Sequence, residues 1–261
     1  MTTAQPAHDD FLIFADHLAD TSRAMLLEAC RHRPQVQIKA DASFVTSADR
    51  AVETALREMI MTRFPNHGIL GEEFDNVNTD AEFVWVLDPI DGTAPFIAGI
   101  PVYGTLIGLA WQGRPFLGVM DHPVTADRWC GVSSRFATRN GAPVRVRPCA
   151  ALQEAFVTCS NVDFMSPADQ ARFARIRQRA RYVQYGGSCY AYGVLASGHT
   201  DLAIDGGLAP FDVYACAAVI EGAGGRVTDW QGAPLSFDMT GTVIAAGDPC
   251  RLSEALALLQ D

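Results

Sequence analysis

Two segments near the N-terminus have apolar residues at the spacing of one helix face. In residues 8–32 the apolar stripe consists of Phe11, Phe14, Leu18, Met25 and Ala29. In residues 46–64 it consists of Val52, Leu56, Met59 and Ile60. Because a helix repeats about every 3.6 residues, each segment is predicted to be an amphipathic helix with one face on a core. A polar stretch, residues 37–43, separates the two segments.

Shorter apolar runs, rich in β-branched and aromatic residues, predict strands. A short strand is expected over residues 68–74 and another over residues 83–87. Residues 103–111 and 115–121 follow as two further strands. They are joined at Gln112-Gly113, which is typical of a hairpin.

The second half of the chain mixes helices and strands in the same way. Ser166-Pro167 begins a predicted helix, since proline is favoured at the first helical position. Residues 210–223 and 249–260 have helical patterns, and residues 226–229 and 242–246 predict strands. The fold class is therefore mixed α/β (α+β), with helices covering the faces of sheets.

Composition is typical of a globular protein of the cytoplasm. A length of 261 residues with 49% apolar content is enough for a large core. The net charge of −10 argues against a nucleic-acid partner, since phosphate backbones select basic surfaces. The seven cysteines include no CxxC pair, which indicates reduced thiols. No segment has the pattern of a signal peptide or the length of a membrane span, so we expect a cytoplasmic protein with no membrane partner.

The predicted strand at residues 83–87 stops at two carboxylates, in the run Asp88-Pro89-Ile90-Asp91-Gly92-Thr93. Carboxylates at the end of a buried strand have a large desolvation cost unless a cation neutralises them. Hard oxygen ligands suit Mg²⁺, Mn²⁺ or Ca²⁺ better than zinc. The glycine and threonine leave backbone N–H groups for a phosphate. The alternative is a turn in which Asp91 only hydrogen-bonds the backbone, but two acids around a proline favour a metal.

Other acids have a structural explanation beside a functional one. Glu72-Glu73 end the predicted strand at residues 68–74, where they are either a solvated loop or further carboxylates for a metal pair. Asp49 stands three residues after Thr46, the spacing of a helix capping box. Asp212 lies early in the predicted helix that starts near residue 210, where an acid is also favoured. On spacing alone, Asp49 and Asp212 are predicted to be helix caps.

Several patterns argue against other chemistries. Five arginines between residues 172 and 181 are expected on a solvated helix face, although such a run can also steer an anionic substrate. The six histidines form no HxH or HxxxH pair, and the chain has no GxSxG elbow or Walker-type loop. The sequence therefore argues against a histidine zinc site, a serine hydrolase and a P-loop kinase.

Taken together, these acids resemble the inositol monophosphatase superfamily. The matching elements are Val45-Thr46-x-x-Asp49, Glu72-Glu73, Asp88-Pro89-Ile90-Asp91-Gly92-Thr93, Phe211-Asp212 and Glu221-Gly222-Ala223-Gly224-Gly225. The resemblance covers residues 11–258, and its DPIDGT motif is highly specific. It replaces the helix-cap interpretation of Asp49 and Asp212, because both fall on functional positions of the family.

The resemblance implies a layered α-β-α-β-α sandwich that forms one compact unit. Residues 1–145 would be an N-terminal half with most of the metal-binding acids, and residues 146–261 a C-terminal half with Asp212 and the substrate rim. The family's properties further imply two or three Mg²⁺ ions, with Mn²⁺ as a substitute and Li⁺ or Ca²⁺ as inhibitors. They also imply a small phosphorylated substrate and a homodimer.

The resemblance also assigns roles to single residues. The first metal would be held by Glu72, Asp88 and the backbone carbonyl of Ile90. The second metal would be held by Asp88, Asp91 and Asp212. Glu72 and Thr93 would orient the attacking water, and Asp49 would bond the Thr93 hydroxyl. The N–H groups of Gly92 and Thr93 would receive the phosphate of a monoester, which metal-activated water would hydrolyse without a covalent intermediate.

Softer signals resemble the histidinol-phosphate phosphatase branch of the superfamily. They are residues 85–87, 103–107, 186–193 and 197–202, which mostly shape a pocket wall. Ser188, Cys189 and Asp205 are the substrate-binding residues that this branch implies. Two of them depart from it, since Ser188 stands where aspartate is usual and Asp205 where glutamate is common. Further departures are Phe44, Ala94 and Ala209.

Histidinol phosphate is therefore the expected substrate, with inositol phosphate or another small polyol or amino-alcohol phosphate as the alternative. A catalytically silent binding module is less favoured, because all the metal acids are present. A sugar bisphosphatase is also less favoured, because it needs a second basic subsite and Ala94 and Ala209 stand where basic residues are common. Cys189 is expected to serve packing, as most buried free cysteines do.

Overall fold

The computed structural model describes residues 8–32, 35–38 and 44–260. The predicted polar stretch at residues 37–43 lies largely outside the described residues. Its two described flanks form a small antiparallel sheet of β1 (Val36–Ile38) and β2 (Phe44–Thr46).

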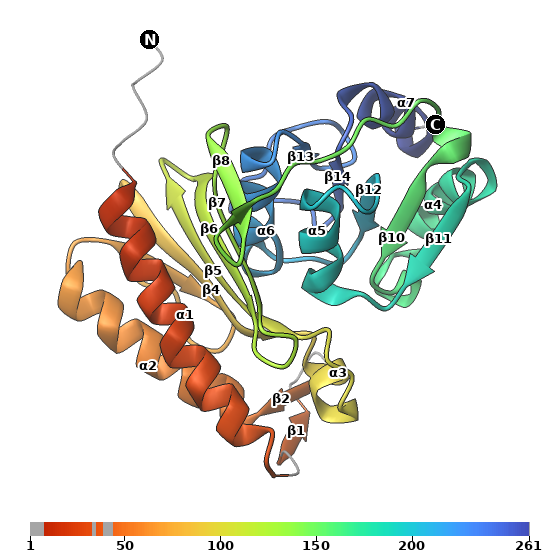
Figure 1. The fold of residues 1–261 in the computed structure, drawn as a ribbon. Coiled ribbons are helices and arrows are strands. Elements are labelled where there is room, and N and C mark those ends of the chain that lie inside the picture. The colour runs from red at the N-terminus through yellow and green to blue at the C-terminus, as the bar shows by residue number, and fades with distance from the viewer. Residues whose placement is uncertain (1–7, 33–34, 39–43, 261) are drawn as a thin grey trace.

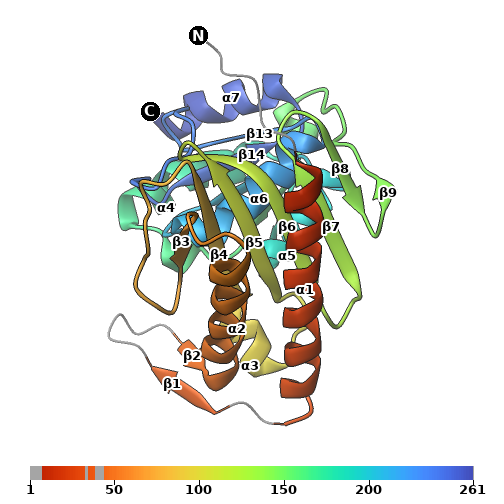
Figure 2. The same cartoon turned by 90° about the vertical axis from the view of Figure 1, so that its left-hand side faces the viewer.

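The chain folds into five layers in the order helix, sheet, helix, sheet, helix (Figure 1). Two long helices, α1 (Asp9–Ala29) and α2 (Ser47–Arg63), cover the outer face of a seven-stranded sheet, as Figure 2 shows. Helices α5 (Ser188–Ala196) and α6 (Pro210–Gly222) lie between this sheet and a five-stranded sheet. Helices α4 (Pro167–Arg179) and α7 (Pro249–Gln260) cover the far face of the five-stranded sheet. The predicted layered sandwich is confirmed.

The seven-stranded sheet follows the order of the chain. Its strands are β3 (Gly68–Gly71), β4 (Phe83–Asp91), β5 (Gly104–Trp111), β6 (Arg114–His122), β7 (Asp127–Val132), β8 (Phe136–Arg139) and β9 (Ala142–Pro143). The pairing is antiparallel throughout except between β3 and β4. The predicted hairpin at Gln112-Gly113 is confirmed as the β5–β6 connection.

The five-stranded sheet has the order β11-β10-β12-β14-β13 and mixes parallel with antiparallel pairs. Its strands are β10 (Phe156–Cys159), β11 (Tyr182–Tyr185), β12 (Leu202–Asp205), β13 (Arg226–Thr228) and β14 (Val243–Ala246). The last two strands were predicted from the sequence; the first three were not. The predicted helices at residues 210–223 and 249–260, and the helix start at Ser166-Pro167, are confirmed.

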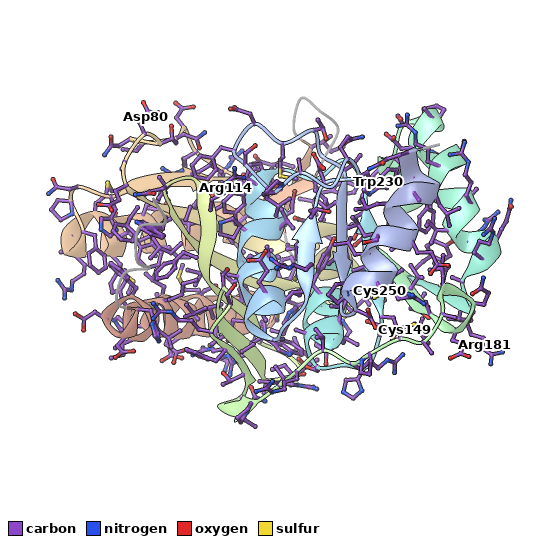
Figure 3. All side chains as sticks on the ribbon, turned by 90° about the horizontal axis from the view of Figure 1, so that it is seen from above. Asp80, Arg114, Cys149, Arg181, Trp230 and Cys250 are labelled. Carbon is purple, nitrogen blue, oxygen red and sulfur yellow. The ribbon has the colours of Figure 1, made fainter. Side chains whose placement is uncertain are left out.

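Among the residues that the structure describes, three hydrophobic cores fill the spaces between the layers. The first lies under α1 and α2 and includes Trp85, and the second surrounds α6 and includes Tyr214. The third lies between the five-stranded sheet and α4 and α7, and includes Trp230, which is labelled in Figure 3. Within the described residues, no helix combines the length and the apolar character needed to cross a membrane.

Glycines in three neighbouring strands let α6 lie directly on the seven-stranded sheet. Gly108, Gly118 and Gly131 are paired in register across β5, β6 and β7. A Cβ at Gly118 would lie 2.1 Å from the carbonyl oxygen of Ala215, and one at Gly131 would lie 2.6 Å from the Cα of Val219. Because only glycine allows this approach, these residues fix the depth of α6 and therefore the position of its first turn.

Candidate active site

An irregularity in β4 turns two acids toward the same side of the sheet. Asp88 pairs with Leu106 and Asp91 with Gly104, so two residues of β4 lie opposite Thr105 alone. This is a β-bulge. Side chains alternate along a regular strand, so residues three apart would face opposite sides. The extra residue places both acids on the side of α6.

The two cores confirm this change of face. Val86 packs in the core around α6, whereas Leu87 and Ile90 both pack in the core under α1 and α2. The prediction that the strand ends at Leu87 is wrong, because β4 continues to Asp91. Pro89 interrupts the ladder by lacking an N–H group, and the strand absorbs it as a bulge instead of ending.

Asp88, Asp91 and Asp212 come together where the bulge meets α6. Within the described residues, one carboxylate oxygen of each lies within 4.8 Å of the others. Asp212 reaches this point as the third residue of α6, where its Oδ2 accepts a hydrogen bond of 2.6 Å from the N–H of Ala209. Asp88 Oδ1 accepts one of 3.0 Å from the N–H of Ile90.

The electrostatics of this cluster fit a bound cation. Burial raises the pKa of Asp88 well above its usual range, and the charges of Glu72 and Asp91 raise it further. Burial and the charge of Asp91 likewise raise the pKa of Asp212. Burial also raises the pKa of Asp91, against a hydrogen bond from Cys189 that lowers it. One buried and two half-buried acids that repel one another are unfavourable alone, and a divalent cation offsets both the desolvation cost and the charge repulsion.

Asp49 and Asp212 are helix caps as well as members of this region. Asp49 Oδ2 accepts hydrogen bonds from the N–H (2.8 Å) and the hydroxyl (2.6 Å) of Thr46, which completes a capping box on α2. Its charge also raises the pKa of Asp88, which places it near the cluster. The cap interpretation that the family resemblance had replaced is therefore confirmed. The role of Asp49 beside the metal site stays a prediction.

Thr93, a predicted phosphate-binding residue, is the first residue of the short helix α3 (Thr93–Ala98), which follows the bulge directly. Its hydroxyl donates to the carbonyl oxygen of Ile90 at 3.2 Å. Gly92 precedes it with a φ of 81°, a left-handed conformation that favours glycine. The bond between Thr93 and Asp49 and the phosphate contacts of Gly92 and Thr93 stay predictions.

Glu72 lies just beyond β3, in a bend that α2 holds. The predicted strand over residues 68–74 is too long, because β3 ends at Gly71. Arg57 of α2 donates to the carbonyl oxygens of Phe74 (3.1 Å) and Asp75 (3.0 Å) and turns the chain away from the sheet. The charge of Glu72 raises the pKa of Asp88 and Asp212, so Glu72 lies near the cluster, although it is not one of the three acids within 4.8 Å of one another.

The N-terminus of α5 closes the site from the other half of the chain. The N–H of Cys189 donates to Asp91 Oδ2 at 2.7 Å. A Cβ at Gly92 would lie 2.9 Å from the Ser188 hydroxyl oxygen, so Ser188 packs directly on the DPIDGT loop. The Cys189 thiol is buried, as expected for a packing role, and burial together with Asp91 raises its pKa. Helix α5 was not predicted from the sequence.

Asp205 ends β12 with its carboxylate inside the protein. It accepts hydrogen bonds from the N–H of Ser160 (2.6 Å) and the hydroxyl of Tyr192 (2.8 Å). Burial raises its pKa. Tyr192 and Ser160 were not predicted as site residues, although Tyr192 lies in the segment at residues 186–193 that resembles the histidinol-phosphate phosphatase branch.

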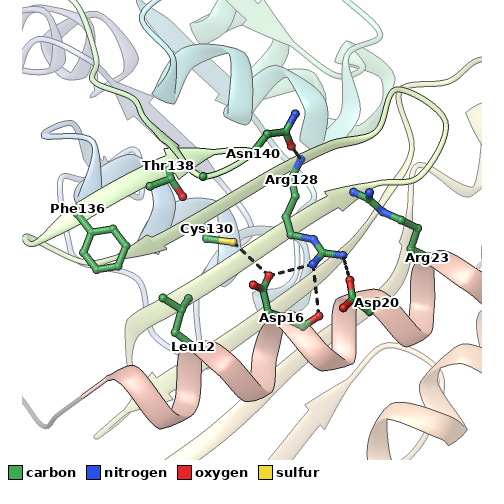
Figure 4. Close-up of a pocket in the computed structure, with 10 residues that line it drawn as sticks. Leu12, Asp16, Asp20, Arg23, Arg128, Cys130, Phe136, Thr138 and Asn140 are labelled. Carbon is green, nitrogen blue, oxygen red and sulfur yellow. Dashed lines mark hydrogen bonds and ion pairs between the residues drawn. The ribbon is translucent and has the colours of Figure 1, made fainter.

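A separate cavity of about 420 Å³ lies under α1 on the opposite face of the sheet (Figure 4). Arg128 spans it, with ion pairs to Asp16 (3.0 Å), Asp20 (2.8 Å) and Asp121 (2.6 Å). Arg23 forms a second pair with Asp121 at 2.7 Å. Because these charges satisfy one another, they hold α1 on the sheet and leave the acid cluster as the candidate active site.

The layered fold and its acid cluster are typical of a class of metal-dependent phosphatases. The chain belongs to the inositol monophosphatase family, whose model matches residues 8–260. It is therefore a phosphoric monoester hydrolase.

Similar proteins have more than one named activity. The chain is 38% identical over 261 residues to a chloroplastic bifunctional phosphatase of Arabidopsis thaliana, and the match covers 97% of this chain and 75% of the relative. It is 34% identical to a histidinol-phosphatase of Chlorobaculum parvum, over 90% of this chain and 91% of the relative. Among solved structures, an inositol monophosphatase from Zymomonas mobilis superposes with a TM-score of 0.89 at 38% identity, over 98% and 100% of the two chains.

Proposed function

We propose that this phosphatase uses Mg²⁺ to hydrolyse a small amino-alcohol phosphate, with histidinol phosphate as its substrate. The observation that carries the metal chemistry is the cluster of Asp88, which is buried, with Asp91 and Asp212, which are half-buried; one carboxylate oxygen of each lies within 4.8 Å of the others, and their charges repel one another. Carboxylate oxygens without histidine or cysteine ligands favour a hard cation such as Mg²⁺. The substrate rests on relatives named histidinol-phosphatase, of which Chlorobaculum parvum provides one.

The proposed ligands divide between two metals that share one acid. Glu72, Asp88 and the carbonyl of Ile90 would hold one ion. Asp88, Asp91 and Asp212 would hold the other. When bound, the ions would neutralise the phosphate oxygens and lower the pKa of the attacking water.

The remaining roles belong to groups of the chain itself. Glu72 would accept a proton from the attacking water, and the Thr93 hydroxyl would orient that water. The N–H groups of Gly92 and Thr93 would donate to the phosphate oxygens and hold the phosphorus in line with the water. The N–H of Cys189 would keep Asp91 in a single orientation through its 2.7 Å hydrogen bond.

A cationic amine on the substrate fits the charge around the site. Asp205 raises the pKa of both Asp91 and Asp212, so its charge is felt at the cluster. A substrate amine in the site would be stabilised by that charge without touching the buried Asp205 carboxylate, whereas the uncharged ring of inositol would gain only hydrogen bonds. Inositol phosphate is the second candidate, because the Zymomonas mobilis structure is an inositol monophosphatase.

Phosphate release with Mg²⁺ should be measured for histidinol phosphate, inositol 1-phosphate and glycerol phosphate. We expect kcat/KM for histidinol phosphate to exceed the other two by at least about tenfold, since a charged contact is worth roughly 1.5–3 kcal/mol. A preference for inositol 1-phosphate would contradict the proposed substrate. Absence of Mg²⁺-dependent release from all three would contradict the metal chemistry as well.

Asp91→Asn should abolish this activity and leave the fold intact. The amide keeps the size of the side chain but lacks the charge that a metal ligand needs, so kcat/KM should fall by at least about a hundredfold. Circular dichroism and the thermal midpoint check that the variant is folded. Asp80→Asn, an exposed acid labelled in Figure 3, is the matched control and should keep wild-type turnover. Near-wild-type activity of Asp91→Asn would refute the proposed site.

A further inference from the structure

A chain of two buried hydroxyls connects α1 to the bulge that carries the metal acids. The Thr105 hydroxyl donates to the carbonyl oxygen of Pro89 at 2.9 Å. Ser22 of α1 forms a short hydrogen bond to the same Thr105 oxygen. Since Thr105 has one proton to give and gives it to Pro89, Ser22 is the donor in this second bond. Both residues are fully buried.

Thr105 is the residue that stands alone opposite the bulge. Asp88 pairs with Leu106 and Asp91 with Gly104, which leaves Pro89 and Ile90 facing Thr105. Pro89 has no N–H group, so the regular ladder cannot be completed at this point. Within this irregular stretch, the side chain of Thr105 donates a hydrogen bond to the carbonyl oxygen of Pro89.

Ser22, the hydrogen-bond partner of Thr105, is held in place by its neighbour on α1. Thr105 pairs with Asp121 across β5 and β6, and Asp121 binds Arg23, the residue after Ser22 on α1. Two consecutive residues of α1 thus contact two paired residues of the sheet. Figure 4 shows Arg23 on the helix face that meets the sheet. The position of Ser22 relative to the bulge is fixed by this double contact.

We propose that Thr105, supported by Ser22, is a positioning residue that holds the bulge so that Asp88 and Asp91 both face the metal site. The proposal rests on the proposed metal chemistry of the cluster. The peptide group of Pro89 lies between the two acids, and its rotation would turn their side chains apart. Thr105 touches neither acid and acts only through the backbone. Its loss should weaken metal binding more than it slows the chemistry of the metal-saturated enzyme.

Thr105→Val tests this, because valine keeps the shape of threonine and removes the hydroxyl. Two quantities are measured: the Mg²⁺ concentration for half-maximal phosphate release, and the rise in thermal midpoint that Mg²⁺ alone produces. We expect the half-saturating concentration to increase about tenfold or more, the usual effect of losing a group that orients a metal ligand. At one fixed Mg²⁺ concentration the thermal rise should shrink, while turnover at saturating Mg²⁺ stays close to wild type.

Two further variants and one control separate positioning from general stability. Thr105→Ser keeps the hydroxyl and should retain the wild-type Mg²⁺ requirement, and Ser22→Ala should raise that requirement in the same direction as Thr105→Val. Ser133→Ala is the control, because the buried Ser133 hydroxyl donates to the carbonyl of Pro115 at 2.9 Å, at another irregularity of the same sheet. It should lower the thermal midpoint without changing the Mg²⁺ requirement.

The proposal is overturned if Thr105→Val has the wild-type half-saturation and the wild-type thermal response to Mg²⁺. If Thr105→Val does not fold, an unchanged Mg²⁺ requirement in Ser22→Ala overturns it instead. Failure of the proposed metal chemistry has a different signature, because the wild-type protein would then show neither Mg²⁺-dependent release nor a thermal response.

Discussion

At the scale of single residues, His122 shows how burial at the edge of the site controls protonation. Its Nδ1 lies 2.9 Å from the carbonyl oxygen of Tyr103, and its Nε2 lies 3.9 Å from the thiol of Cys189. Burial lowers the pKa of His122 to about 4, and the neighbouring acids Asp121 and Asp127 oppose this only in part. The ring is therefore neutral in the folded protein at pH values where the unfolded chain is charged.

This difference predicts that His122 makes the protein less stable as the pH falls. Between pH 6.5 and pH 4 the unfolded chain binds a proton at His122 that the folded protein does not, so stability decreases with decreasing pH through that window. The full effect at the acid end is about 3 kcal/mol. His122→Gln should flatten this part of the pH dependence, measured as the free energy of unfolding in urea at several pH values.

The quantity to compare is the slope of the free energy of unfolding against pH and not the free energy itself, since any change at a buried position also lowers stability. His199→Gln changes an exposed histidine and should leave the slope as in the wild type. A wild-type slope in His122→Gln would mean that His122 titrates normally in the folded protein.

The acids of the candidate site can be identified in the sequence by their type and spacing, but the sequence leaves a helix cap and a metal-site role as alternatives for some of them. Asp49 illustrates the difficulty, because its distance from Thr46 explains it completely as a helix cap. Asp212 has the same explanation at the start of α6. Local spacing contains no information on what lies beyond the helix end, so only the assembled fold brings Asp212 to Asp88 and places the charge of Asp49 near it.

At the scale of elements, a buried ion pair on α2 sets the course of the chain after β3. Glu53 and Arg57 lie one helical turn apart, with 2.7 Å between their charged groups and exposures of 0% and 8%. Glu53 also accepts the N–H of Glu73 at 2.8 Å. A Cβ at Gly71 would lie 2.1 Å from the Glu53 carboxylate, so the strand end and the helix are in direct contact. The pair thus supports the bend in which Glu72 stands.

Arg57→Met should destabilise the protein by about 3–5 kcal/mol, because it leaves the buried charge of Glu53 without its partner. The loss also removes the hydrogen bonds from Arg57 to two backbone carbonyls. Arg50→Met, on an exposed position of the same helix, should change stability by less than about 0.5 kcal/mol. Both values come from unfolding in urea. Equal effects of the two substitutions would show that the pair does not hold the bend.

Elements with a strong period or a clear boundary were predicted well, and irregular ones were not. The N-terminal helices follow from their apolar stripes, and the hairpin follows from Gln112-Gly113. The bulge at Pro89 could not be predicted, because a proline after an apolar run equally indicates the end of a strand. Helix α5 was missed because it is apolar on nearly all sides, which hides its period.

At the scale of the whole molecule, the acid cluster joins parts of the chain that are far apart in sequence. Asp88 and Asp91 belong to the seven-stranded sheet, whereas Asp212 belongs to the helix that separates the two sheets. The N–H of Cys189, from α5, completes the arrangement. Without a cation the cluster opposes the packing of these layers, since the acids repel one another. With a bound cation the same acids would hold the layers together, so the metal would contribute to stability as well as to catalysis.

This reversal predicts a variant whose effect on stability changes sign with the metal. Asp88→Asn removes one of the repelling charges, so in the presence of a chelator it should unfold at a higher temperature than the wild type. In Mg²⁺ the wild type should gain about 2.7 kcal/mol at a hundred times its dissociation constant, and the variant should lose most of that gain. Calorimetry of both proteins, with chelator and with Mg²⁺, makes the comparison, and Asp80→Asn should follow the wild type in both. A variant that is equally destabilised in the two conditions would show that Asp88 serves the fold alone, because a group that binds no metal cannot distinguish them.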